Sequence, residues 1–459
     1  MKGLEGKYAG LSISGGLLIL FLLVVVWLVA FFLLRRQMRR KTLLIALTIF
    51  SITFLGATIG VLSNPLISGV DAPYYPYVVR EFLQGRPLPE PYQPVAFYTA
   101  AAFSVLTNDL TLGTKIAQAL FFPLMVLSAF ILIHYLTKND RISLIVTAVY
   151  ALMSCALSAK VGILKNMAAM ALMPLFYLFF IKFIRGEGKT LDFKVLRLNQ
   201  NFILSIVLFG LLAASHFLTT GFVFITVVAH VMFQLGYHRT LPLRELKFLG
   251  ILVLLILAGM TSASLREKVV CTTNAFAESQ PVPDSLFPFT LTGVGVPGTA
   301  FLPFILVGFI GFFLVLARRD RSVYPLAVAL LAGMVCAQPW VIDPEYSFRF
   351  GVLTMTAIVP LVAFGAAIIA GRHRKLSMGL IGTLAAFAIG MFIGLGLIAG
   401  AVGPGFLSVE KWEFSAGLRE QLPENCVLVA GHSEYFFDFE YWDLSLIHIS
   451  EPTRPRLLS

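Results

Sequence analysis

Long apolar segments alternate with short polar or basic loops along most of the chain. An apolar run of about 18 residues or more is long enough to cross the ~30 Å hydrocarbon core of a bilayer. A shorter apolar run at 95–106 is typical of an interfacial or re-entrant helix. The pattern predicts an all-α polytopic membrane protein. We expect about twelve transmembrane helices, at residues 17–34, 43–62, 116–136, 142–157, 167–184, two short crossings within 202–235, 248–264, 300–316, 324–341, 351–370 and 378–402.

Basic residues gather in alternate loops, which indicates how the helices are oriented. The loops on one side, beginning with residues 35–41, contain 21 of the 35 Lys and Arg residues but 5 of the 24 Asp and Glu residues. Basic loops stay on the cytoplasmic side of a membrane. We therefore expect an integral protein of a prokaryotic plasma membrane with both termini extracytoplasmic.

The composition supports this class and excludes others. Hydrophobic residues make up 58% of the 459 residues and charged residues 13%, whereas soluble domains are about a quarter charged. The orientation bias accounts for the net charge of +11, so we expect the lipid bilayer and no nucleic acid as a partner. The cysteines lack pairing or metal-ligand spacing: Cys155, Cys271, Cys336 and Cys426.

The chain divides into four parts by composition. Residues 1–42 form an N-terminal signal-anchor helix with a basic loop, and residues 43–402 form the transmembrane domain. From 403 to 443 a short helical turn and a buried-type strand predict the truncated start of an extracytoplasmic α/β domain. Leu444–Ser459 resembles a translated sequencing adapter, and we expect this tail to be non-native.

Charged side chains are absent from the centres of the predicted helices. An ion-coupled transporter would carry carboxylates at mid-depth, so the pattern moves the polar chemistry to the outer rim. Asp71 is the leading candidate there, in a loop at 63–94 that prolines stiffen. Its carboxylate suits a general base for an acceptor hydroxyl, a ligand for a divalent cation such as Mg or Mn, or the cap of an Asp-Ala-Pro turn.

The same loop contains aromatic and basic candidates for substrate binding. Tyr74 and Tyr75 suit a sugar face or an interfacial aromatic belt. Arg80 and Arg86 suit a phosphate group or lipid headgroups.

Further candidates lie at other predicted outer turns. Arg349 precedes an apolar run, where its guanidinium can grip the phosphate of a lipid whose tail enters the bilayer, or can snorkel to the interface. His216 marks the tip between two crossings, where it binds substrate or caps a helix. Lys160 and Lys165 add positive potential near a pyrophosphate, and Glu278 in the loop at 265–298 is another substrate-binding candidate.

Several of these features together resemble the GT-C superfamily of polytopic glycosyltransferases, which use polyprenyl-phosphate or polyprenyl-pyrophosphate sugar donors. The resemblance rests on the helix pattern from Leu43 to about Asp443, on Asp71-Ala-Pro-Tyr-Tyr after an early helix, and on Ser215-His216 and Phe348-Arg349-Phe350. It implies that Asp71 is the first-loop acid and Arg349 the donor-phosphate arginine. The loop has one Asp where the superfamily often has Asp-x-Asp, so both metal use and the oligosaccharyltransferase subclass stay open.

The resemblance predicts a membrane glycosyltransferase of inverting, hexosyltransferase type. It would transfer a sugar from a polyprenyl-linked donor to a glycan, lipid or protein acceptor on the extracytoplasmic face. The alternatives are a lipid-linked-sugar flippase or transporter, which needs a polar path deep in the membrane, and a non-catalytic membrane protein.

Overall fold

Long helices build nearly all of the structure, in agreement with the predicted all-α membrane class. The structure, a computed structural model, describes residues 39–62, 74–85, 94–161, 164–193, 196–239, 241–259, 302–336, 344–373 and 375–383, with short pieces elsewhere. The helices are α2 (Arg40–Leu62), α3 (Tyr74–Leu83), α4 (Pro94–Thr107), α5 (Leu110–Thr137), α6 (Asp140–Val161), α7 (Leu164–Ile184), α8 (Gln200–Ala213), α9 (Phe217–His238), α10 (Leu243–Gly259), α12 (Leu302–Arg318), the 3-10 turn η2 (Arg321–Val323), α13 (Tyr324–Cys336) and α14 (Pro344–Ala370).

Short strands are the remaining elements. They pair as β1 (Thr190–Phe193) with β2 (Leu196–Asn199), β3 (Thr290–Leu291) with β4 (Val296–Pro297), and β5 (Val427–Ala430) with β6 (Ser445–His448), the last pair parallel. β5 lies within residues 403–443, where a strand was predicted, and the separate domain expected there stays a prediction. Its partner β6 lies in the tail that resembles an adapter.

Five helices of the described part are long and apolar enough to cross a membrane: α2, α5, α7, α9 and α14. The helices α4, α8, α12 and α13 are apolar but shorter. The two crossings predicted within 202–235 correspond to α8 and α9, with the turn at His216 between them, but the second is not short: α9 continues to His238 and its apolar span has 21 residues. The expected crossing at 17–34 and most of that at 378–402 lie outside the described residues, and the count of twelve stays a prediction.

The helices differ in how deeply they are enclosed. In α7, 94% of the most apolar 18-residue stretch is buried, and in α5 the share is 78%. These two helices therefore form the centre of the bundle. In α2 only 11% of the corresponding stretch is buried, and Ile52, Leu55 and Ile59 are all exposed. The exposed apolar side chains of α2 are typical of a helix that faces lipid. The apolar and enclosed helices α5 and α7 are typical of a central position.

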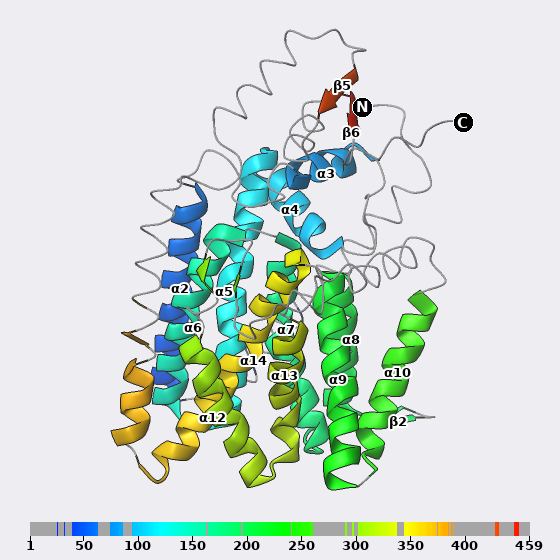
Figure 1. The fold of residues 1–459 in the computed structure, drawn as a ribbon. Coiled ribbons are helices and arrows are strands. Elements are labelled where there is room, and N and C mark those ends of the chain that lie inside the picture. Colours follow the sequence, from blue (N-terminus) through cyan, green and yellow to red (C-terminus); the bar gives the residue numbers. More distant parts are fainter. Residues whose placement is uncertain are drawn as a thin grey trace, which may run out of the picture.

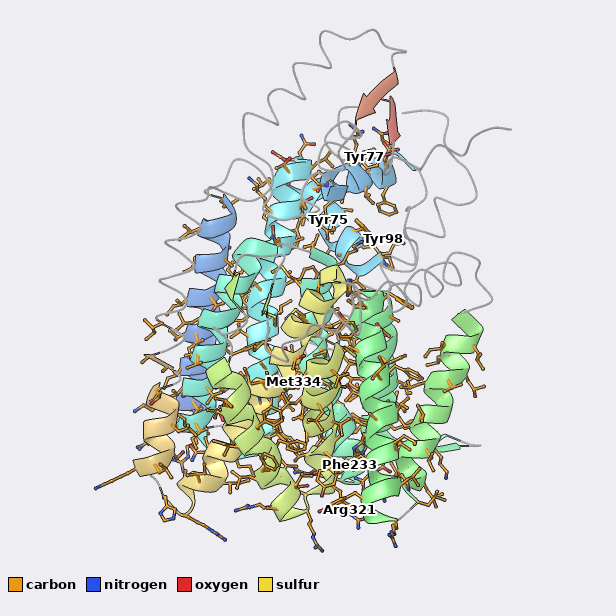
Figure 2. The ribbon with its side chains drawn as sticks, viewed as in Figure 1. Tyr75, Tyr77, Tyr98, Phe233, Arg321 and Met334 are labelled. Carbon is orange, nitrogen blue, oxygen red and sulfur yellow. The ribbon has the colours of Figure 1, made fainter. Side chains whose placement is uncertain are left out.

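Figure 1 shows the two ends of the bundle, which differ in the side chains that they carry. At one end, which we call the α3 end, α2 finishes, α3 and α4 lie, and α14 begins. The opposite end, which we call the basic end, carries exposed cationic side chains, as Figure 2 shows around Arg321. Among them are Arg39, Lys138, Arg239, Arg318 and Arg372. This separation agrees with the loop charges counted along the sequence.

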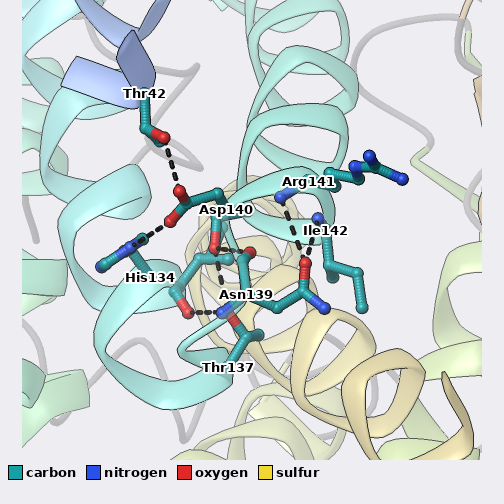
Figure 3. A network of polar contacts seen from close by, with 9 residues as sticks. Thr42, His134, Thr137, Asn139, Asp140, Arg141 and Ile142 are labelled. Atoms are coloured by element: carbon teal, nitrogen blue, oxygen red, sulfur yellow. Dashed lines mark hydrogen bonds and ion pairs between the residues drawn. The ribbon is translucent and has the colours of Figure 1, made fainter. Parts of the chain in front are cut away.

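A polar network closes the turn between α5 and α6 at the basic end (Figure 3). Asp140 accepts a hydrogen bond from the Thr42 hydroxyl at 2.5 Å and pairs with His134 Nε2 at 2.9 Å. Asn139 caps α6 by accepting from the backbone N–H groups of Arg141 and Ile142. The network joins α2, α5 and α6 at the basic end, and Asp140 is a structural partner of His134 there.

The crossing of α12 with α14 depends on glycine. A Cβ atom added at Gly311 would overlap the carbonyl oxygen of Leu361, and one at Gly365 would lie 3.0 Å from Gly311 Cα. Small residues allow membrane helices to approach this closely. The contact therefore holds only while both positions lack a side chain.

We expect Gly311→Ala to lower stability by about 1–3 kcal/mol, because α12 must move away from α14. Gly250→Ala in α10 is the matched control, since nothing lies within 4 Å of its Cβ position. Alanine favours a helix over glycine, so the control should unfold at the same temperature or higher. Thermal unfolding in detergent compares the two, and equal behaviour would contradict the close crossing.

Candidate functional site

The predicted site residues fall into two groups by what the structure describes. Asp71, Arg86 and Glu278 lie outside the described residues. Tyr74, Lys160 and Arg349 lie in α3, α6 and α14 respectively, and their side chains are not described. The described side chains are Tyr75, Arg80, Lys165 and His216.

Helix α3 is amphipathic and lies with its apolar face against α4. Tyr75 is fully buried, and its ring centroid lies 5.9 Å from that of Phe97. Two turns further along α3, Phe82 meets Tyr98 edge to face at 5.2 Å. Tyr75 thus anchors α3 to α4, which fixes the segment that directly follows the Asp71 loop.

Arg80 is on the more exposed side of α3. Its guanidinium carbon lies 5.5 Å from the centre of the Tyr77 ring, within the range of a cation–π contact. Its Nε is 3.8 Å from Glu81. The cation therefore sits at the α3 end with an aromatic and an acidic neighbour from its own helix.

Two predicted residues, Lys165 and His216, lie at the starts of α7 and α9. His216 is the N-cap of α9, and its Nδ1 accepts from the backbone N–H of Thr219 at 3.3 Å and lies 2.9 Å from the Thr219 hydroxyl. The same hydroxyl donates to Asn166 Oδ1 at 3.2 Å, and Asn166 follows Lys165 in the first turn of α7. Because Nδ1 accepts, the neutral imidazole carries its proton on Nε2.

Helix α4 is attached to the same cluster. The backbone N–H of Val95 donates to the carbonyl oxygen of Ala214 at 3.1 Å, which ties the start of α4 to the turn before α9. Lys165 Nζ lies 5.9 Å from the centre of the Phe97 ring, and its side chain is 9% exposed. A buried ammonium must be compensated or bound by an anion. We call Phe97, Lys165, Asn166, His216 and Thr219 the α3-end cluster.

The beginning of α14 approaches α9 close to this cluster. Phe350 is 2% exposed and meets Phe222 of α9 edge to face at 6.0 Å. Phe222 is one helical turn beyond Thr219, and Phe350 follows Arg349 in sequence. The backbone of Arg349 therefore lies at the α3 end, on a helix that contacts the helix of His216.

Lys115 and Gln118 are polar residues of α5 that the sequence reasoning missed. They are 6% and 4% exposed and lie near the α3 end of α5. The predicted crossing began at residue 116, whereas α5 begins at Leu110 with Asp109 accepting from the Leu112 N–H at 2.8 Å. Asp109 at the start of an apolar run was the available signal, since Asp is a preferred N-cap.

No group of three or more His, Cys, Asp or Glu side chains that could hold a metal occurs within the described part of the chain. The expected metal ligand, Asp71, is outside that part. Two cavities lined by described residues, of about 930 and 470 Å³, lie at the basic end and not at the α3 end.

Comparison with solved structures identifies the fold. The chain is similar to the archaeal oligosaccharyltransferase AglB from Archaeoglobus fulgidus, in complex with an inhibitory peptide and a dolichol-phosphate (TM-score 0.53, 14% identity, 89% of this chain and 64% of that one). It is also similar to ArnT from Cupriavidus metallidurans bound to undecaprenyl phosphate (TM-score 0.54, 10% identity, 88% of this chain and 86% of that one). The chain has the GT-C fold.

A second structure of the archaeal enzyme, in complex with Zn and sulfate, gives a similar match (TM-score 0.55, 14% identity, 88% of this chain and 62% of that one). The chain thus spans less than two thirds of the archaeal oligosaccharyltransferases that it matches. No family model and no curated protein matches the sequence. At these identities the GT-C likeness is one of fold.

Proposed function

We propose that the chain is a membrane glycosyltransferase that uses a polyprenyl-phosphate or polyprenyl-pyrophosphate sugar donor. The observation that carries this proposal is the GT-C fold, with polar side chains from α7 and α9 gathered at the end where α3, which begins three residues after Asp71 in sequence, and the start of α14 also lie. The basic end is cytoplasmic and the α3 end extracytoplasmic in this proposal. The acceptor is a glycan, a lipid or a protein.

Transfer would proceed by a single displacement with inversion. The acceptor oxygen attacks the anomeric carbon, its proton passes to the Asp71 carboxylate, and the bond from that carbon to the donor phosphate oxygen breaks. The electron pair leaves on the phosphate, where Arg349 and Lys165 stabilise the charge that develops. The phosphate is a good leaving group because it is already ionised, so the step needs no general acid.

The flippase alternative requires a polar path through the bundle. The buried basic side chains Lys115 and Lys165 lie near the α3 end, and Lys182 lies at the basic end of α7. Between the two ends of the bundle, the apolar stretches of α5 and α7 form an enclosed centre. This distribution favours chemistry at one surface over passage of a sugar through the described bundle.

A transfer assay tests the proposal. The protein in membrane vesicles is incubated with a panel of polyprenyl-linked sugars that differ in sugar and in phosphate number, and released polyprenyl phosphate and glycosylated product are measured. We expect one donor class to yield both in equal amounts. Movement of intact donor between leaflets without release of polyprenyl phosphate would favour the flippase instead.

Asp71 could act directly or through a cation, and the same assay distinguishes these roles. If the carboxylate holds Mg or Mn, a chelator will abolish transfer and either ion will restore it. If Asp71 acts as the base, transfer will survive the chelator.

His216 allows capping to be separated from substrate binding. Asparagine is as good an N-cap as any residue, so His216→Asn should keep the Tm, whereas His216→Ala should cost about 1 kcal/mol. If the imidazole donates to the donor phosphate, His216→Asn should still slow transfer about tenfold, the effect of one hydrogen bond to a charged group. Full activity of the asparagine variant would assign His216 to capping.

A further inference from the structure

A cavity of about 470 Å³ lies at the basic end, between segments that are distant in sequence. It is bounded by the end of α7, the last turns of α9, the start of α10 and the turn that leads into α13. Four of its lining residues are arginines: Arg185, Arg244, Arg319 and Arg321. Arginine forks match phosphate oxygens in geometry as well as in charge.

Arg185 and the two acids that line the cavity, Asp320 and Glu245, have close partners within the protein. Arg185 donates to Ser322 Oγ at 2.7 Å, to the Tyr135 hydroxyl at 3.0 Å and to Asp320 at 3.1 Å. Burial lowers the pKa of the Arg185 guanidinium, but Tyr135, Asp320 and Glu187 around it outweigh burial and raise that pKa. Arg185 therefore stays charged and serves as a fixed wall of the cavity.

Besides Asp320, the cavity is lined by the acid Glu245, which is buried and whose Oε1 lies 3.9 Å from His230 Nε2. Arg244 next to it is exposed and makes a long contact of 3.5 Å to the carbonyl oxygen of Ile184. Arg319 is exposed as well. The acids are thus turned to internal partners, and the cavity keeps positive charge at its mouth.

Gln234 gives an independent sign of a ligand. It lines the cavity from α9 and is 2% exposed, and its amide Nε2 has no hydrogen-bond partner among the described residues. A buried amide donor without an acceptor is costly, and native proteins seldom keep one. A phosphate oxygen entering between the arginines would accept from it.

The rim of the cavity carries exposed apolar side chains, which a site for a soluble phosphate would not need. Leu241 and Leu243 line the same cavity and are 63% and 60% exposed. Tyr237, one α9 turn from Gln234, is 53% exposed and stacks on Phe233 with ring centroids 5.2 Å apart. Figure 2 shows Phe233 and Arg321 together at this end. Exposed tyrosine and leucine beside arginine are typical of the level where headgroups meet acyl chains.

We propose that this cavity binds the phosphate headgroup of an anionic phospholipid from the leaflet at the basic end. Arg244 and Arg319 contact the phosphate, Gln234 donates to one of its oxygens, and the exposed leucines contact the acyl chains. The site is separate from the α3-end cluster and lies at the opposite end of the bundle. It does not depend on the proposed transfer reaction.

Lipid retention measured by native mass spectrometry tests this site. The purified full chain is titrated with phosphatidylglycerol or phosphatidylcholine of the same acyl chains, and the bound lipid is counted. We expect the double variant Arg244→Gln with Arg319→Gln to bind phosphatidylglycerol about tenfold more weakly or worse. The control is Arg372→Gln with Lys375→Gln, which removes the same charge from exposed positions beyond α14 and should change binding less than twofold.

A third variant and a competitor complete the test. Gln234→Leu removes the buried amide, so it should weaken lipid binding while leaving the Tm unchanged or higher. Inorganic phosphate at millimolar concentration should not displace the lipid, because it lacks acyl chains. Equal losses in the cavity and control variants, equal binding of the two lipids, or full displacement by inorganic phosphate would each overturn the proposal.

Discussion

Asp71→Asn is expected to reduce sugar transfer by about 10²- to 10⁴-fold, the contribution of a positioned general base. Asparagine keeps the size and turn-forming capacity of aspartate but accepts no proton at neutral pH. The loss should appear in kcat and not in the KM of the donor, because the acid acts on the acceptor in the transition state. Initial rates measured against donor and acceptor concentrations separate these terms.

Asp109→Asn provides the matched control for this substitution. Asp109 is an exposed acid at the α3 end of the bundle, and it caps α5 by accepting from the Leu112 N–H. Asparagine caps a helix as well as aspartate does. We expect this variant to retain the Tm and the transfer rate. If Asp71→Asn were as active as Asp109→Asn, Asp71 would have no role as base or as metal ligand.

Hydropathy alone predicted helix positions well where one apolar run fills most of a helix. For α2 and α7, the expected ranges of 43–62 and 167–184 lie within three residues of the helices at Arg40–Leu62 and Leu164–Ile184. Basic residues lie only near the ends of these helices, Arg40 and Lys41 in α2 and Lys165 and Lys182 in α7, so the apolar run and the helix nearly coincide. Such agreement follows from the length that a bilayer imposes.

Prediction failed where polar residues belong to a helix. The predicted crossing began at residue 116 and so left out Lys115, which is buried within α5. Burial of that kind depends on neighbouring helices, and hydropathy along one segment does not contain them. The contact of Asn166 with Thr219 depends likewise on two helix starts, 53 residues apart, lying side by side.

The sequence led to His216 and Lys165 but not to the way they are joined. His216 was expected at a tip between crossings and does begin α9 there. Phe97 and Asn166, which connect the two predicted residues, are an ordinary aromatic and an amide that no pattern singled out. Residue chemistry therefore indicated His216 and Lys165. Phe97 and Asn166 became evident only from the packing of α4, α7 and α9.

Substitution of Arg349 is the sharpest test of donor binding. A guanidinium that forks onto the donor phosphate gains strength as charge develops on the leaving group, so Arg349→Gln should slow transfer about 10²-fold. Arg349→Lys keeps the charge but loses the fork, and it should recover only part of the rate. Transfer rates with monophosphate and pyrophosphate donors measure both effects.

The control for Arg349→Gln is Arg318→Gln, which removes an exposed arginine at the end of α12, on the basic end. Both variants lose one positive charge. Only Arg349 lies at the α3 end, where the next residue, Phe350, contacts α9. A phosphate clamp predicts a large loss for Arg349→Gln and none for Arg318→Gln. A snorkelling interfacial arginine predicts small, similar effects in both, together with full activity of Arg349→Lys, because an ammonium snorkels as well as a guanidinium does.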